Sequence, residues 1–473
     1  MLFNSIEFGI FLVIVYALYW SVGVKRRVFQ NFLLLLASYV FYGLWDWRFL
    51  GLLVASSLLD FSIGILLSKS KTQNRKRWLL ATSVFWNIGV LITFKYFNFF
   101  IEEFKFLIGS SSEISIWNVI VPVGLSFYTF QTLSYSIDIY RGRIQPTKNI
   151  LNFLCFVSFF PQLVAGPIER AKKLLPQFEK TRSFNLQSSK EGLRQILWGL
   201  FKKILVADKL GVGVSLVFDN PESYGTVMLL YGSLLFFFQI YCDFSGYTDI
   251  AIGTAKLFGF KLSRNFNIPY LSTSITEFWQ RWHITLTNWF TDYVYLPFIK
   301  KFRKKTRFAY SLGLMLTMSL VGVWHGANYT FLAFGVLNGL ILLSERIIKF
   351  KNGDTLQKKL YKIPRTLSLL YFLFIAAMVS LVFRAQNIGD VYTIVSRIFS
   401  FTEDNNLSIL IGLKIVFLFV LIIAEVYTKQ KQFPLEKLEE KLSRPLRWGV
   451  YYLIILLIIR FNTVEEPFIY FQF

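Results

Sequence analysis

The sequence predicts an all-α, multi-pass integral membrane protein, and three observations lead to this class. Hydrophobic residues make up 54% of the 473 residues, and the mean hydropathy is +0.49. The apolar residues form continuous runs rather than alternating, which favours helices over the strands of a membrane barrel. Basic residues gather in the short segments between the runs, where positive charge is typical of cytosolic loops.

The apolar runs predict about eleven membrane spans, because a helix needs about 20 apolar residues to cross a bilayer. The first run has no basic segment before it and no small-residue cleavage site after it, so it is not expected to be a cleaved signal peptide. The runs are 8–22, 29–44, 49–67, 78–99, 116–137, 227–240, 309–320, 331–343, 367–382, 407–427 and 448–459.

The net charge of +23 is interpreted as membrane topology rather than nucleic-acid binding, since the basic clusters fall between the spans. Residues 462–473 are then expected on the extracytoplasmic side. The clusters expected to face the cytosol are 24–27, 69–77, 141–143, 300–307, 349–351 and 429–431.

No linker or repeat divides the chain, so one membrane domain over residues 1–473 is expected. Cys155 and Cys242 lie in apolar context and are expected to be buried thiols rather than a disulfide or metal ligands. No metal site is expected, because the two histidines, His283 and His325, are far apart in sequence and no ligand-spaced partner accompanies them.

Two regions in the middle of the chain do not fit simple spans. Residues 151–166 are apolar but short, contain Pro161 and are followed by basic residues, which suggests a re-entrant hairpin. Residues 241–297 mix aromatic and polar side chains, so they are expected to be irregular, with amphipathic helices at an interface or around a cavity.

His325 is the first candidate for chemistry. It lies in VGVWHGANYTF (321–331), between two apolar runs. An ionisable side chain in such a place is costly to bury and therefore marks a candidate functional site. A buried imidazole stays neutral and can accept a proton, as a general base must. Trp324 and Asn328 flank it. Asn328 shares a face with His325 if the stretch is helical, and would orient a substrate carbonyl or cap a helix. A structural hydrogen-bond donor is the alternative for His325.

His283 is the second candidate and lies in the aromatic and polar segment 265–298, next to Trp282 and close to Asn288. It would position an acceptor or tune His325, and a plain interface anchor is equally compatible with its surroundings. Together with Trp324 and Asn328, Trp282 and Asn288 are the candidate substrate-binding side chains.

These segments resemble the membrane-bound O-acyltransferase (MBOAT) family, and its bacterial alginate O-acetyltransferase branch in particular. The resemblance runs over the whole chain, through SFFPQLVAGPIERA (158–171), DFSGYTDIAIGTAKLFGF (243–260), RWHITLTNWFTDYVYLPF (281–298) and VWHGANYTFLAFG (323–335). It implies a bowl of helices with re-entrant segments around a central funnel. It also implies that His325 is the catalytic histidine and His283 the second conserved polar position.

The resemblance further implies a membrane-embedded acetyltransferase of the bacterial cytoplasmic membrane. Acetyl-CoA would be the donor, with no bound cofactor, and an exported polysaccharide such as alginate the final acceptor. An extracytoplasmic partner of the SGNH hydrolase type would take the acetyl group and pass it to the sugar.

The segment FIYFQF (468–473) resembles the C-terminal motif of a small single-span subunit of the teichoic-acid D-alanylation system. There the motif tyrosine is proposed to carry the acyl group, so Tyr470 is expected to be a transient acyl carrier, with His325 as its base. An aromatic plug or interface belt is the alternative.

Two other functions remain open from the sequence. One is a transporter or flippase for a polysaccharide or lipid-linked intermediate, which many spans and broken helices would suit. The other is the same enzyme class with D-alanine as its cargo.

Overall fold

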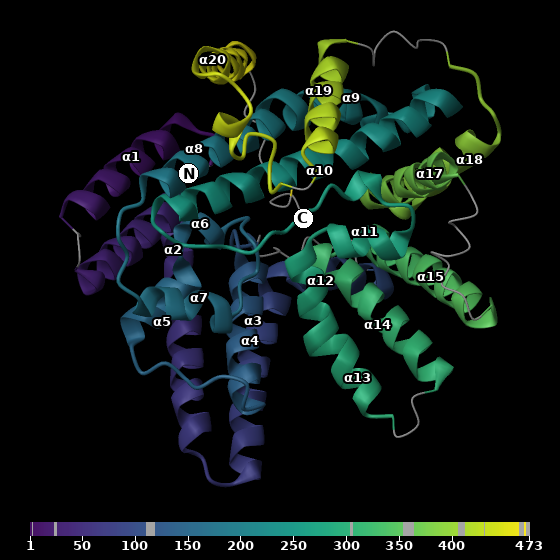
Figure 1. Cartoon of the computed structure of the whole chain (residues 1–473). Helices are drawn as coiled ribbons and strands as arrows, with labels where there is room; N and C mark the ends of the chain where they lie inside the picture. The colour runs from purple at the N-terminus through teal and green to yellow at the C-terminus, as the bar shows by residue number, and fades with distance from the viewer. Residues whose placement is uncertain are drawn as a thin grey trace. The chain divides into compact units, whose positions relative to one another are not determined.

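The computed structural model describes the chain except residues 2, 23–25, 110–118, 303–305, 353–363, 405–411, 430, 463–467 and 470–473. Every regular element among the described residues is a helix, which confirms the all-α prediction. Figure 1 shows the helices coloured along the chain.

The chain folds into two compact units. Unit 1 comprises Met1–Ile196 and Tyr247–Ser263, and unit 2 comprises Leu197–Gly246 and Arg264–Phe473. The division falls within two helices, α8 and α10. The single domain expected over residues 1–473 stays a prediction.

Unit 1 is built around the long helix α2, which joins two of the predicted apolar runs and kinks at Asp46, whose backbone is extended. A buried carboxylate in its second half, Asp60, accepts hydrogen bonds from Ser83 (2.5 Å), Ser136 (2.7 Å) and Asn87 (2.7 Å). Each of these partners lies on a neighbouring helix, so one polar cluster fixes α2 against α3 and α4. The helices of unit 1 are α1 (Ile6–Ser21), α2 (Arg27–Lys69), α3 (Gln73–Ile108), α4 (Leu125–Tyr140), α5 (Ile150–Ser158), α6 (Phe160–Leu163), α7 (Ala171–Glu179) and most of α8 (Leu186–Leu200).

The predicted hairpin at 151–166 is a broken helical segment. Phe159 leaves the helical conformation (φ −52°, ψ 104°) and separates α5 from the single turn of α6. Pro161 lies in the first turn of α6, where a missing N–H costs no helical hydrogen bond. The break agrees with the sequence, and the re-entrant path through a bilayer stays a prediction.

Unit 2 contains two π-helical turns, Phe201–Ala207 and Thr291–Tyr295, set among longer α-helices. The α-helices are the end of α8, α9 (Asp208–Asp219), α10 (Thr226–Leu257, to Gly246 in this unit), α11 (Ile275–Arg281), α12 (Ile284–Phe290), α13 (Leu296–Lys300), α14 (Arg307–His325), α15 (Tyr329–Asn352), α17 (Arg365–Arg384), α18 (Ile388–Phe399), α19 (Leu413–Tyr427) and α20 (Arg444–Phe461).

The irregular region predicted from residue 241 begins later than expected. Residues 241–257 continue α10 as regular helix, so this part of the prediction was wrong. The polar side chains that suggested a break are accommodated within the helix: Asp243, for example, pairs with Lys203 at 2.7 Å. From residue 265 to 300 the short amphipathic helices α11, α12 and α13 agree with the prediction.

Five described helices are long and apolar enough to cross a membrane, and the chain is a multi-pass membrane protein by this criterion. Shorter apolar helices occur at Ile6–Ser21 and Ile150–Leu163. The five helices are Arg27–Lys69, Gln73–Ile108, Thr226–Leu257, Arg307–His325 and Arg365–Arg384.

Helices α14 and α15 pack closely because glycines face each other across their interface. A Cβ atom at Gly322 would lie 2.2 Å from the carbonyl oxygen of Phe331 and 2.9 Å from Cα of Gly335. A Cβ atom at Gly335 would lie 2.4 Å from the carbonyl oxygen of Met318. Small residues at a helix crossing allow backbones to approach in membrane proteins. The position of His325, three residues after Gly322, therefore depends on this contact.

We expect Gly322→Ala and Gly335→Ala to destabilise the protein by about 1–3 kcal/mol, because the new methyl group meets backbone that has no room to move. Gly89→Ala is the matched control, since nothing lies within 4 Å of its added Cβ atom. Thermal unfolding in detergent measures the effect. Equal melting temperatures for all three variants would contradict the close contact.

Candidate functional site

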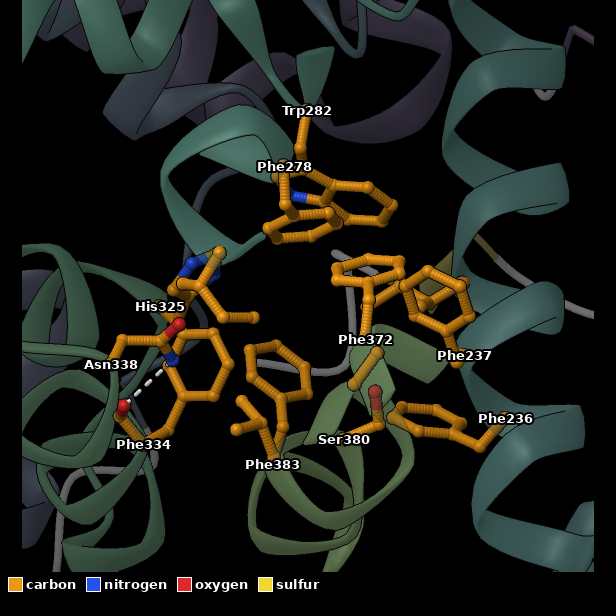
Figure 2. Close-up of a pocket in the computed structure, with 14 residues that line it drawn as sticks. Phe236, Phe237, Phe278, Trp282, His325, Phe334, Asn338, Phe372, Ser380 and Phe383 are labelled. Atoms are coloured by element: carbon orange, nitrogen blue, oxygen red, sulfur yellow. Dashed lines mark hydrogen bonds between the residues drawn. The ribbon is translucent and has the colours of Figure 1, made fainter. Parts of the chain in front are cut away.

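A cavity in unit 2 is lined by α10, α11, α14, α15 and α17. Its polar groups are His325, Asn338 and Ser380, set among aromatic rings that point inward (Figure 2). An apolar cavity with a few converging polar groups is typical of a small-molecule site. The other lining residues are Phe236, Phe237, Ile240, Ile275, Phe278, Trp282, Phe334, Phe372, Ala376, Val379 and Phe383.

His325 is the last residue of α14, and its side chain is buried. The helix ends there because Gly326 is extended, and a Cβ atom at Gly326 would lie 2.3 Å from the ring of Phe331. Because residue 326 is a glycine, the Phe331 ring of α15 can lie directly beside the turn that follows His325. Asn328 caps α15 by accepting from the Thr330 N–H (3.0 Å), and its own amide donates to the carbonyl of Gln386 (2.7 Å).

Aromatic edges hold the His325 imidazole in place. Its centroid lies 5.0 Å from that of Phe383 and 5.8 Å from that of Phe334, both nearly perpendicular to it. Trp324 packs on the other side at 4.9 Å. Rings packed in this way exclude water and fix the direction of the imidazole, so a reacting group in the cavity would meet a preoriented base.

Phe278 of α11 and Trp282, just past the end of this helix, form the upper wall of the cavity in Figure 2. Two polar side chains of α15, those of Glu345 and Asn338, hold α11 in place. The Glu345 carboxylate accepts from the backbone N–H groups of Ile275 (2.8 Å) and Thr276 (3.0 Å), where the helix dipole favours an anion. The Trp279 indole donates to the Asn338 side chain at 3.1 Å. The cavity wall is therefore tied to the same helix that follows His325.

His283 is fully buried in the turn between α11 and α12, in a left-handed conformation (φ 40°, ψ 51°). Such a conformation costs a residue other than glycine about 1–3 kcal/mol and is found at functional sites. The oxygen of Asn265 accepts from the Thr285 N–H (3.2 Å) and hydroxyl (2.8 Å), so Nδ1 of His283, 3.2 Å away, must be the donor. In a neutral ring Nε2 then carries the lone pair.

Burial lowers the pKa of His283 to about 3, well below its ordinary value of 6.5. The ring is therefore neutral above pH 4 in the folded protein, whereas the unfolded chain takes up a proton below pH 6.5. The contribution of this group to stability is fully present above pH 6.5 and is lost as the pH falls toward 3.

The structure brings only some of the predicted site residues together. His325 and Trp282 line the cavity, and Trp324 lies between the two histidines, 5.9 Å from His283 and 4.9 Å from His325. Asn288 is exposed on α12. Asn328 lies beyond the end of α14, so the expected helical face shared with His325 does not form, and the capping alternative holds.

Tyr470 lies outside the described residues, but the two residues before it are described. Phe468 is fully buried and packs on Phe244 at 5.4 Å, and the backbone N–H of Ile469 donates to Asp243 at 2.9 Å. The ring of Phe244 also contacts His283, at 4.7 Å. Residues 468–469 are thus docked within unit 2, one aromatic ring away from His283.

Ser380 and Asn338 were not predicted as site residues, because their segments appear in the sequence as plain apolar spans. On α17 a signal was available: Phe372, Ala376, Val379, Ser380 and Phe383 recur at helical spacing and share one face. Among the described residues, no group of three His, Cys, Asp or Glu side chains could hold a metal ion. Cys155 and Cys242 are buried free thiols, as predicted.

Comparison with known proteins identifies relatives of this chain. A family model described as MBOAT, membrane-bound O-acyltransferase family, matches residues 143–383. A probable alginate O-acetylase of Azotobacter vinelandii is 37% identical over 412 residues, 85% of this chain and 79% of that protein. A peptidoglycan O-acetyltransferase of Helicobacter pylori is 33% identical over 77% of this chain and 72% of its own. A teichoic acid D-alanyltransferase of Bacillus subtilis is 28% identical over 48% and 59%.

We expect ¹⁵N NMR of histidine-labelled protein to show His283 as a neutral ring protonated at Nδ1 from pH 5 to 9. The protein has only two histidines, so His283→Asn assigns the signals without ambiguity. A His283 signal that titrates with a midpoint near 6.5 would contradict the buried, Asn265-bonded ring.

Proposed function

The chain belongs to the membrane-bound O-acyltransferase family, and from that membership we propose that it transfers an acetyl group from cytosolic acetyl-CoA for O-acetylation of a cell-surface polysaccharide. The observation that carries the proposal is the buried His325 at the wall of an apolar cavity. The alginate O-acetylases match far more of the chain than the D-alanyltransferases do, which favours acetyl over D-alanyl as the cargo. The relatives named above are transferases or O-acetylases by their descriptions, which favours the enzyme over a transporter.

His325 is the proposed general base. The acceptor hydroxyl gives its proton to the imidazole as its oxygen attacks the thioester carbonyl, and the resulting tetrahedral intermediate expels the coenzyme A thiolate. The imidazolium then returns the proton to the thiolate, so the ring is restored. The Ser380 hydroxyl, which faces the same cavity, can donate a hydrogen bond to the acyl oxygen.

His283 is proposed as a positioning residue rather than a second base. Its ring acts on His325 through Trp324, which contacts both imidazoles. Trp282 is proposed to contact the donor or acceptor, since it lines the cavity. Asn288 and Asn328 are proposed to act outside the cavity: Asn288 is exposed, and Asn328 caps the helix that follows His325.

Tyr470 is the proposed acceptor of the first transfer. A phenol has a pKa near 10, so at neutral pH it needs a base such as His325 to become a nucleophile. The resulting aryl acetate is an activated ester. It would pass its acetyl group to a serine of an SGNH-type partner on the extracytoplasmic side of the bacterial cytoplasmic membrane, and that partner would acetylate the sugar.

We expect His325→Gln to lower acetyl transfer from acetyl-CoA by about 10²–10⁴-fold, the range typical of a lost general base, while the melting temperature changes little. Release of coenzyme A by purified protein measures the rate. Ser344→Ala, an exposed serine on α15, is the control. Wild-type turnover in His325→Gln would sink the assignment.

Tyr470→Phe distinguishes the two possible roles of this residue, acyl carrier and aromatic plug, because it removes the hydroxyl and keeps the ring. We expect intact-mass analysis after incubation with acetyl-CoA to find one acetyl group on Tyr470 of the wild type and none in the variant. Glycan acetylation in cells should be lost with the adduct. Full glycan acetylation by Tyr470→Phe would leave the tyrosine a structural role only.

A further inference from the structure

A buried ion cluster in unit 2 contacts the backbone of residues 468–469. Lys203 contacts Asp208 and Asp243, each at 2.7 Å, and none of the three side chains is more than 4% exposed. Lys203 contacts one oxygen of the Asp243 carboxyl group, and the second oxygen accepts a hydrogen bond from the backbone N–H of Ile469 at 2.9 Å.

The local fold is built to bring this cluster together. Lys203 lies in the π-helical turn Phe201–Ala207, and π-helical turns inside α-helices are frequent at functional sites. Gly246, one turn after Asp243, allows α10 to approach this turn: a Cβ atom there would lie 2.9 Å from the carbonyl oxygen of Gly199 and 3.2 Å from the nitrogen of Lys203. A larger residue at 246 would push Asp243 away from Lys203.

The contact with the chain end is made through the backbone and one aromatic side chain. Phe468 fills a site against Phe244, whose ring also contacts His283. The N–H of Ile469 then fixes the direction in which the chain leaves that site. A carboxylate already held by an ammonium cannot swing away to follow a moving tail, so it makes a rigid acceptor.

We propose that Asp243 is a positioning residue that anchors residues 468–469, with Lys203 and Asp208 holding its carboxylate in place. This role rests on the proposed function, because it gives the acyl-carrying segment that begins at Tyr470 a fixed starting point beside Phe244 and His283. A free tail samples many geometries, whereas an anchored segment is held in one. Anchoring therefore raises the rate of an intramolecular transfer.

The test uses the full chain with Phe473→Cys labelled by a fluorescent maleimide, since Cys155 and Cys242 are buried. Ile469→Pro removes the donated N–H without touching the ion cluster, and Asp243→Leu removes the acceptor. Both should lower the fluorescence anisotropy of the label and slow formation of the tyrosine adduct at least tenfold. Ile469→Ala keeps the N–H, so in this control variant the anisotropy should stay high.

High anisotropy in both Ile469→Pro and Asp243→Leu would overturn the anchor. Low anisotropy with an unchanged rate of adduct formation would overturn its part in transfer. The anisotropy needs no acetyl-CoA, so it decides the anchor even if the protein fails to transfer acetyl groups. Ile469→Pro keeps the test usable if Asp243→Leu does not fold.

Discussion

The close contact of α14 with α15 is the constraint on which the rest of the site depends. Two helices whose backbones touch at Gly322 and Gly335 can be joined by a turn of only three residues, and that turn directly follows His325. The same helix α15 carries Phe334 and Asn338 into the cavity and ties down α11 through Glu345. The crossing of α14 and α15 therefore fixes the positions of the proposed base His325, of the cavity wall and of α11, the helix that precedes His283.

Three buried polar side chains of unit 2, those of Glu345, Asp243 and His283, are each held by a defined partner in an apolar surrounding. Glu345 sits at a helix N-terminus, Asp243 is paired with Lys203, and His283 donates to Asn265. These contacts satisfy the polar groups and also fix the orientation of their side chains. Acyl transfer requires fixed orientations, because a thioester, a base and a nucleophile must meet at the same time. The two histidines take different parts in this arrangement, since only His325 lines the cavity.

Much of this could be predicted from the sequence. Apolar runs with basic loops gave the all-α membrane class, and the scarcity of histidine singled out His325. Contacts between distant segments could not be predicted. Asp243 suggested a break in its helix, because its partner Lys203 lies forty residues away. The helical spacing on α17 indicates one face but not which helices that face meets. The role of Asn328 was ambiguous because it depends on where α14 ends. That end is set by the ring of Phe331, which packs against Gly326.

The central claim is that the thioester is attacked in the cavity beside His325. A cryo-EM structure of the protein with a non-hydrolysable acetyl-CoA analogue tests it most directly. The account predicts the acetyl end among Phe334, Ser380 and Phe383, within hydrogen-bond reach of the His325 side chain or of an acceptor bound to it. An analogue bound with its acetyl end outside this cavity would contradict it.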